Sequence, residues 1–182
     1  DESANLPFLQ AFGGEIMSDN GEFKAANSEF IEGINWIKQL RDKKYIPADS
    51  GGRTADDIWT AFGREHRLGI AALGLWGIKA LESKFLMDFE VVHFPTSDAN
   101  RPSHSYIGTS GFYVFKNPDK YHVALSMELA KFLTNGENQK DLVKYTQFPT
   151  RASTGNIYAD NHHMSSALDI LQEGCSVFPD SR

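Results

Sequence analysis

A chain of 182 residues that is 41% hydrophobic and 23% charged is long enough to bury a core, so its composition excludes a disordered segment. The net charge of −6 and the dispersed lysines and arginines argue against a nucleic-acid-binding surface. The single cysteine, Cys175, excludes an internal disulfide and a cysteine-based metal site. No apolar run approaches the roughly 20 residues that a membrane-spanning helix needs.

The first third of the chain is predicted to form two helices. Residues 5–10 look like the start of a helix that we expect to end at Gly13-Gly14, because glycine suits the left-handed backbone that closes many helices. A second, amphipathic helix is predicted from Asn27 to Leu40. Asn27 is a good N-cap residue, and the apolar residues after it recur at helical spacing.

Helices and short strands are expected to alternate in the middle of the chain. The pair Thr54 and Asp57 resembles a capping box for the helix that follows it. Residues 68–73 are apolar, few in number and flanked by glycines, which is typical of a buried strand. A helix is expected over residues 76–85, and residues 90–94 are predicted to form a second strand that stops at a proline.

The second half of the chain is predicted to be mainly helical. Residues 106–115 are expected to be extended, with a glycine-rich interruption. Asn117-Pro118 is predicted to begin a long helix, with proline at the favourable first position, and Asn135-Gly136 to close it. Further helices are expected over 137–145 and 162–172. Four apolar residues are expected to line the buried side of the long helix: Leu125, Leu129, Phe132 and Leu133. Short strands that alternate with helices predict an α/β fold.

The order of several short segments is also informative. In chain order these are Ala11-Phe12-Gly13-Gly14, Trp59-Thr60-Ala61-Phe62-Gly63-Arg64, the apolar run 68–73, Trp76-Gly77, Val91-Val92-His93-Phe94-Pro95, Ile107-Gly108-Thr109-Ser110-Gly111-Phe112 and Phe148-Pro149-Thr150-Arg151. This order resembles the C-terminal half of the extracellular solute-binding proteins (family 1) that serve ABC importers, the sugar-binding group that contains maltose-binding protein. The resemblance covers about Leu6 to Pro179.

The resemblance implies a domain organisation. It implies a type II periplasmic-binding-protein-like lobe, with strands that alternate with helices, in a fragment of a two-lobed protein. Residues 1–107 would form the main part of the C-terminal lobe, and residues 157–182 would return to it. Residues 108–156 would be a crossover segment whose helices normally pack on the N-terminal lobe. Without that lobe, we expect these helices to fold back on their own lobe or the fragment to self-associate.

The resemblance also implies a function. A protein of this family binds a sugar or oligosaccharide without catalysis, closes its lobes by a hinge motion, and delivers the ligand to the permease of an ABC importer. It would act outside the cytoplasm, in the periplasm or as a cell-surface lipoprotein, without a cofactor or a metal ion. Two alternatives are a small carbohydrate-active hydrolase or transferase, which needs two converging carboxylates, and a sensory binding lobe.

Trp76 is the first candidate ligand-binding residue. It follows the expected strand 68–73 between Gly74 and Gly77, and ligands of open α/β sheets bind at the carboxyl ends of strands. Its indole could cover the apolar face of a sugar ring, and tryptophan at the matching family position commonly stacks on ligand. The alternative interpretation is a buried core tryptophan. Trp36 and Trp59 lie on predicted helices and are interpreted as packing residues.

The glycine-rich segment Gly108-Thr109-Ser110 offers a second candidate. Its backbone N–H groups and two hydroxyls could contact a ligand, because glycine permits close approach. The segment resembles the second crossover between the lobes, and a plain connection is the alternative interpretation. It does not fit a phosphate-binding loop, because no Gly-Lys-Ser/Thr sequence ends it.

Arg151 and Asn5 complete the candidate ligand-binding residues. Arg151 follows Pro149, like the Pro-x-Arg element of the family, and its guanidinium could form forked hydrogen bonds to hydroxyls or to an anion. A structural salt bridge is the alternative for Arg151. Asn5 precedes the first helix, where family members often place a ligand contact. The six histidines lack the i, i+4 spacing of a helical zinc site, so no metal site is predicted.

Overall fold

The computed structural model describes residues 2–18, 20–101, 103, 105–108 and 111–176. Seven α-helices are present in this part of the chain: α1 (Glu2–Gln10), α2 (Ser28–Asp42), α3 (Ala55–Trp59), α4 (Ile78–Ser83), α5 (Lys120–Leu133), α6 (Gly136–Lys140) and α7 (His162–Glu173). Two short strands, β1 (Ser105–Tyr106) and β2 (Cys175–Ser176), pair in parallel. None of the helices in the described segments has the length and apolar character needed to cross a membrane.

Several helix boundaries match the sequence prediction because local capping determines them. The side chain of Asn27 accepts a hydrogen bond from the backbone N–H of Phe30 at 2.8 Å, and α2 begins at the next residue after this cap. Gly13 has a φ of +86°, the left-handed backbone that glycine adopts at little cost. The prediction for Pro118 is wrong in detail. Asp119 caps α5 by accepting from the backbone N–H of Tyr121, so the proline lies just outside the helix.

The strands expected at residues 68–73 and 90–94 are not formed. Both segments run without a ladder partner in the described part of the chain, where the one sheet pairs Ser105 with Cys175 and Tyr106 with Ser176. A strand makes its hydrogen bonds with a neighbour, so an apolar extended run without a partner stays irregular. The alternation of strands and helices is therefore not seen among the residues that the structure describes.

The best-packed region lies where α4, α7 and the chain before α7 meet. Its buried members are Ile78, Tyr158, Met164 and Ala167, and Phe89, Val91, Phe148, Leu75 and Ile157 pack against them. A second contact joins α1 to α2, where Gly33 lets the helices approach so closely that a Cβ there would lie 3.0 Å from the Cα of Leu9. Trp36 of α2 packs between the rings of Phe8 and Phe12, which confirms its interpretation as a packing residue.

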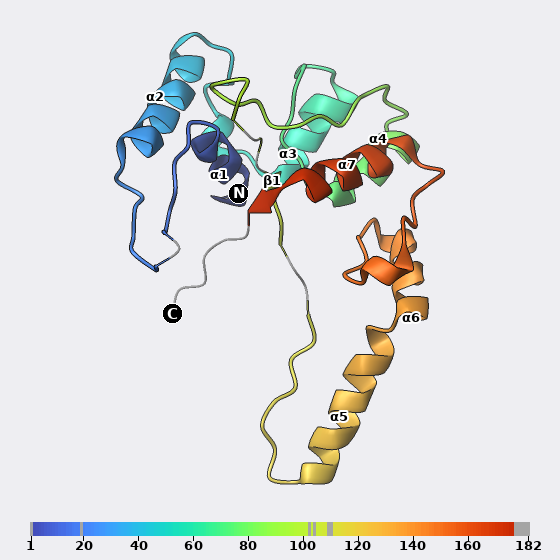
Figure 1. Ribbon diagram of the computed structural model, residues 1–182. Coiled ribbons are helices and arrows are strands. Elements are labelled where there is room, and N and C mark those ends of the chain that lie inside the picture. The colour runs from blue at the N-terminus through green and yellow to red at the C-terminus, as the bar shows by residue number, and fades with distance from the viewer. Residues whose placement is uncertain (1, 19, 102, 104, 109–110, 177–182) are drawn as a thin grey trace.

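The segment from residue 111 to α6 stands away from the remaining helices (Figure 1). An extended run leads out from the body, and α5 returns toward it. We call residues 111–140 the arm. The apolar residues expected to be buried on α5 are exposed to between 39% and 61% of their surface, so that prediction is wrong within this chain: Leu125, Leu129, Phe132 and Leu133. No other element of the described chain covers them, and α5 has no buried residue.

Candidate functional site

Trp76 lies on a single 3₁₀ turn, Leu75–Gly77, that connects the irregular apolar run 68–73 to α4. Its side chain is 51% exposed, whereas the neighbouring Leu75 packs against the core of α4 and α7. A core tryptophan would be almost fully covered. The exposure therefore contradicts the alternative of a core residue and leaves one large aromatic surface available to solvent or ligand.

The indole of Trp76 rests on a second tryptophan. The ring centroids of Trp59 and Trp76 are 4.8 Å apart at an interplanar angle of 30°, and Trp59 is only 5% exposed. The interpretation of Trp59 as a packing residue is confirmed. Its contact with Trp76 was not predicted, because 17 residues separate the two and nothing local in the sequence signals the turn that joins them.

The helix that carries Trp59 is fixed at its start by the predicted capping box. The side chain of Thr54 accepts from the backbone N–H of Asp57 at 3.3 Å, and the carboxylate of Asp57 accepts from the backbone N–H of Thr54 at 2.8 Å. The backbone N–H and the hydroxyl of Thr54 both donate to the Asp57 carboxylate at 2.8 Å, and these two hydrogen bonds hold the pKa of Asp57 below its usual range. Helix capping therefore explains why an acidic residue stands at position 57, and no catalytic role is needed to account for it.

The glycine-rich candidate is described only in part. Thr109 and Ser110 lie outside the described residues, so their predicted contacts stay predictions. Gly108 is exposed, and a Cβ at this position would meet nothing closer than 3.8 Å, in the ring of Tyr106. The described residues therefore leave the space above Gly108 open, and packing among them does not demand a glycine there.

Arg151 has well-defined partners near the end of α5. Its Nε donates to the carbonyl oxygen of Thr134 at 2.6 Å, and its backbone N–H donates to Oε1 of Gln139 at 3.1 Å. A positive group at a helix C-terminus satisfies a carbonyl that lacks an intrahelical donor and interacts favourably with the helix dipole. Arg151 thus has a structural role, but in the described part of the chain its partners are a backbone carbonyl and an amide oxygen, so the salt bridge expected as the alternative is not seen there.

The candidates do not converge within the described chain. No hydrogen bond or ring contact found there joins Trp76 to Gly108 or to Arg151. By its backbone, Asn5 belongs to the first half of α1 and does not precede that helix. The described chain therefore does not join Trp76, Gly108 and Arg151, and of these three Trp76 alone presents a broad surface for a ligand.

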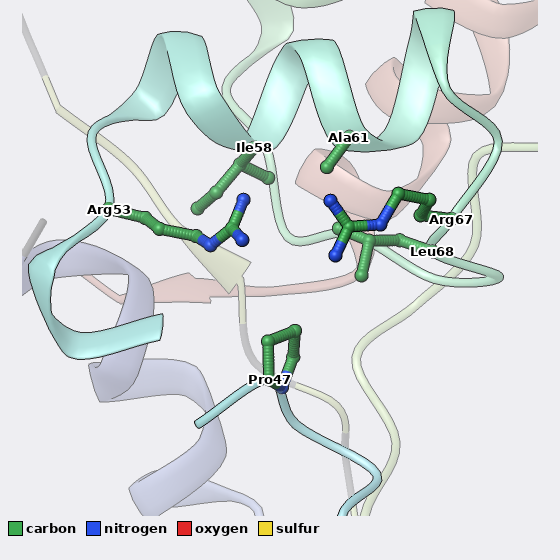
Figure 2. A pocket seen from close by; sticks show the side chains of 6 residues that line it. All are labelled: Pro47, Arg53, Ile58, Ala61, Arg67 and Leu68. Carbon is green, nitrogen blue, oxygen red and sulfur yellow. The ribbon is translucent and has the colours of Figure 1, made fainter. Parts of the chain in front are cut away.

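A small pocket lies beside the helix that carries Trp59, with Ile58 and Ala61 in its lining. In Figure 2 the guanidinium groups of Arg53 and Arg67 enter it from opposite sides. Its volume is about 50 Å³, enough for a few water molecules and too small for a sugar ring. The residues that line it are Pro47, Arg53, Ile58, Ala61, Arg67 and Leu68.

Both arginines at this pocket already have carboxylate partners. Nη2 of Arg53 lies 2.8 Å from Oδ2 of Asp49, and Nη1 of Arg67 lies 3.1 Å from Oε2 of Glu65. The hydrogen bond from Arg53 holds the pKa of Asp49 below its usual range. Because the chain supplies these counter-charges itself, the pocket is a poor candidate for the ligand site.

A polar cluster at the start of α7 was also missed by sequence reasoning. Nδ1 of His163 lies 2.7 Å from Oε1 of Glu82, and its Nε2 lies 2.8 Å from the carbonyl oxygen of Phe89. The imidazole also stacks on the ring of Phe89 with centroids 3.9 Å apart. Asn161, the N-cap of α7, donates to the same carboxylate at 3.0 Å. The partners lie more than 70 residues earlier in the chain, and the cluster attaches α7 to α4 and the segment after it.

The chain is similar to a known protein family and to solved structures. The sequence model of a family described as bacterial extracellular solute-binding protein matches residues 1–163. No curated protein matches the chain in sequence. Among the solved structures that match is the maltose-bound form of MalE3 from T. maritima, with a TM-score of 0.73 and 18% sequence identity.

The match to MalE3 covers 98% of this chain and 47% of the MalE3 chain. The present chain therefore spans about half the length of its structural relative. At this identity the likeness shows the fold alone, and that fold is the type II periplasmic-binding-protein fold expected from the sequence.

Proposed function

Because the chain belongs to the bacterial extracellular solute-binding protein family, we propose that it binds a sugar or oligosaccharide without catalysis, for delivery to an ABC import permease. The observation that carries this proposal is the half-exposed indole of Trp76, seated on a buried tryptophan at the entry to α4. A rigid aromatic face is suited to the apolar face of a sugar ring. The maltose in the MalE3 structure supports the choice of a carbohydrate.

The proposed organisation has two lobes. In it, residues 1–107 and 157–182 belong to the C-terminal lobe, and residues 108–156 cross to the other lobe. Two observations support this division: the match to MalE3 extends over less than half of that protein, and the arm exposes an apolar helix face that another lobe would cover. Ligand would then bind between the lobes, and closure would present the liganded form to the permease.

The proposed ligand site is centred on Trp76. Gly108, Thr109 and Ser110 would supply backbone and hydroxyl hydrogen bonds from the crossover, and Asn5 and Arg151 would contribute from the rim. Arg151 retains free N–H groups for this role, because only its Nε is engaged by Thr134. Lobe closure would have to bring these dispersed residues together.

The proposal is tested by binding measurements with the Trp76→Ala variant of the full-length, two-lobed protein. A thermal-shift screen against mono- and oligosaccharides, polyols and glycerol phosphates first identifies a ligand, and calorimetry then gives its dissociation constant. Loss of an aromatic stacking surface is worth about 1–3 kcal/mol, so we expect Trp76→Ala to weaken binding roughly 10- to 100-fold. The fold should persist because half of the side chain is already exposed.

The control replaces Tyr45, an aromatic residue exposed to 74% in the loop after α2, with alanine. Tyr45→Ala should leave the affinity unchanged. We also expect the affinity to be insensitive to added salt, because a neutral sugar makes no ion pair with Arg151. Unchanged affinity in Trp76→Ala, or a ligand that is released as salt rises, would contradict the proposed sugar site.

A further inference from the structure

We infer that Trp59 is a positioning residue for Trp76, which it holds with a single ring face open to ligand. The inference rests on the sugar-binding function proposed above. It gives Trp59 a role in ligand binding in addition to its role in packing. It implies that the ligand platform is formed before any ligand arrives. The argument depends on the contact between the two indoles, on the two glycines beside Trp76, and on the way in which α3 fixes Trp59.

The contact between the two indoles determines which face of Trp76 is available. The centroids lie 4.8 Å apart with the planes tilted by 30°, so one face of Trp76 is directed at Trp59. Trp59 is 5% exposed and Trp76 is 51% exposed, which agrees with one covered and one open face. A ligand can therefore stack only on the face of Trp76 that is turned away from Trp59.

The glycines beside Trp76 provide the space that the two indoles occupy. A Cβ at Gly77 would lie 1.7 Å from Cη2 of Trp59, and a Cβ at Gly74 would lie 2.3 Å from Nε1 of Trp76. Both distances are far below contact, so neither ring could keep its place beside a larger residue. The backbone angles do not require glycine, because φ is −77° at Gly74 and −79° at Gly77. The Gly-Leu-Trp-Gly sequence is thus needed for the indole pair and not for the turn.

Trp59 is held by packing and not by a hydrogen bond of its indole. It is the last residue of α3, which the capping box at Thr54 fixes, and a π-helical turn over Thr60–Arg64 follows it. Among the described residues its Nε1 is buried without a hydrogen-bond partner. The contact with Trp76 therefore depends on the shape of the Trp59 ring, and phenylalanine should be able to replace Trp59.

A platform that is already ordered in the free protein raises the affinity for ligand. A mobile indole would lose rotamer freedom when a sugar stacked on it, and that loss would weaken binding. With Trp59 beneath it, Trp76 has already lost this freedom during folding. Removing the supporting ring should therefore weaken ligand binding even though Trp59 itself never touches the ligand.

The test compares three variants with the wild type, using maltose as the probe in the intact binding protein. We expect Trp59→Leu to weaken maltose binding about tenfold, and Trp59→Phe to restore the affinity to within about threefold. Trp36→Leu is the matched control, because Trp36 also packs between aromatic rings but does so at the contact of α1 and α2. It should lower thermal stability and leave the affinity unchanged.

A spectroscopic measurement reports the indole pair without any ligand. Two indoles at this separation couple electronically, so the circular dichroism of their ring bands should contain a paired positive and negative signal. The signal should vanish in Trp59→Leu and in Trp76→Ala and persist in Trp36→Leu. Its absence from the wild type, or full maltose affinity in Trp59→Leu, would overturn the positioning role. If Trp76→Ala instead leaves the affinity unchanged while the signal is present in the wild type, the proposed sugar site fails.

Discussion

Gln139 has one of the densest sets of hydrogen bonds in the described chain. It is 6% exposed, and its Nε2 donates to the carbonyl oxygen of Thr134 at 3.1 Å and to Oγ1 of Thr150 at 3.0 Å. Its Oε1 accepts from the backbone N–H of Arg151 at 3.1 Å. Because Arg151 also donates to Thr134, the end of α5 and the segment before residue 152 are joined by one polar cluster. The cluster fixes the place where the arm meets the body.

Replacing Gln139 with leucine should therefore destabilise the protein. The change keeps the approximate volume but removes three hydrogen bonds, and it takes the Gln139 partner from the Thr150 hydroxyl and the Arg151 backbone N–H, at a cost of about 1–3 kcal/mol in the free energy of unfolding. Urea unfolding followed by circular dichroism measures the change. Gln39→Leu on the exposed surface of α2 is the matched control and should shift the stability by less than about 0.5 kcal/mol. Equal stability of both variants would contradict a structural role for the cluster.

Single residues could be predicted where their partners are close in sequence. Asn27, Thr54 and Asp57 were correctly identified as capping residues, because a cap involves positions only two or three residues apart. The interactions of Arg151 with Thr134 and of Trp59 with Trp76 cross 17 residues in each case. Such contacts depend on how intervening turns are folded, and no local pattern in the sequence records them.

At the scale of elements, Tyr158 joins the turn after α6 to the core around α7. Its hydroxyl donates to the carbonyl oxygen of Gln147 at 2.9 Å and lies 3.3 Å from that of Leu142. Its ring packs edge-on against Phe148, and the residue is 5% exposed. Burial raises the pKa of the Tyr158 phenol above its ordinary value of 10.0, because a phenolate would lose its hydration.

This raised pKa predicts a loss of stability in alkaline solution. The folded state binds the phenolic proton more tightly than the unfolded state does, so the stabilisation is complete below about pH 10 and is lost as the pH rises through the folded-state pKa. Urea unfolding at several pH values above about 9 measures this dependence. Tyr158→Phe should reduce it, whereas Tyr121→Phe, at an exposed position on α5, should not. The same alkaline loss in both variants would assign the effect to other groups.

Helices were predicted better than strands for a physical reason. A helix makes its backbone hydrogen bonds within itself, so caps and apolar spacing predicted α2, α5 and α7 closely. A strand needs a neighbour, and residues 68–73 and 90–94 have none in the described chain despite their strand-like sequences. Within the described residues the one ladder pairs Ser105–Tyr106 with Cys175–Ser176, and of these four residues Tyr106 alone belongs to the segment 106–115 that was expected to be extended.

At the scale of the whole molecule, the arm is the part that this chain leaves uncovered. Leu125, Leu129 and Phe132 on α5 are each exposed by half or more, and Phe112 and Phe115 on the extended run are exposed by 60% and 85%. The expectation that the crossover helices fold back on their own lobe is not met for α5 (Figure 1), whereas the turn after α6 does contact Lys79 and Tyr158. Exposed apolar area is unfavourable by about 25 cal/mol per Å², so association with another surface should be favourable.

We therefore predict that the isolated 182-residue chain self-associates through the arm. Sedimentation velocity should show a larger species whose fraction grows with concentration. The double variant Leu125→Glu and Phe132→Glu should shift the population to the monomer without loss of helix content, because both side chains are already exposed. Ser126→Glu on the same helix is the control for added charge and should still associate. A wild-type chain that is monomeric at every concentration would contradict this prediction.

The extended run of the arm should also be accessible to proteases. A protease that cleaves after aromatic residues must draw its substrate into an extended form, and residues 111–117 lack helix and ladder while exposing Phe112, Tyr113 and Phe115. A chymotrypsin-like enzyme should therefore cut the free chain here before it cuts elsewhere. Any surface that covers the arm, whether a second lobe or a second copy, would hide these bonds. The rate of cleavage within residues 111–117 is thus a direct measure of how much of the arm is covered, and it requires no knowledge of what covers it.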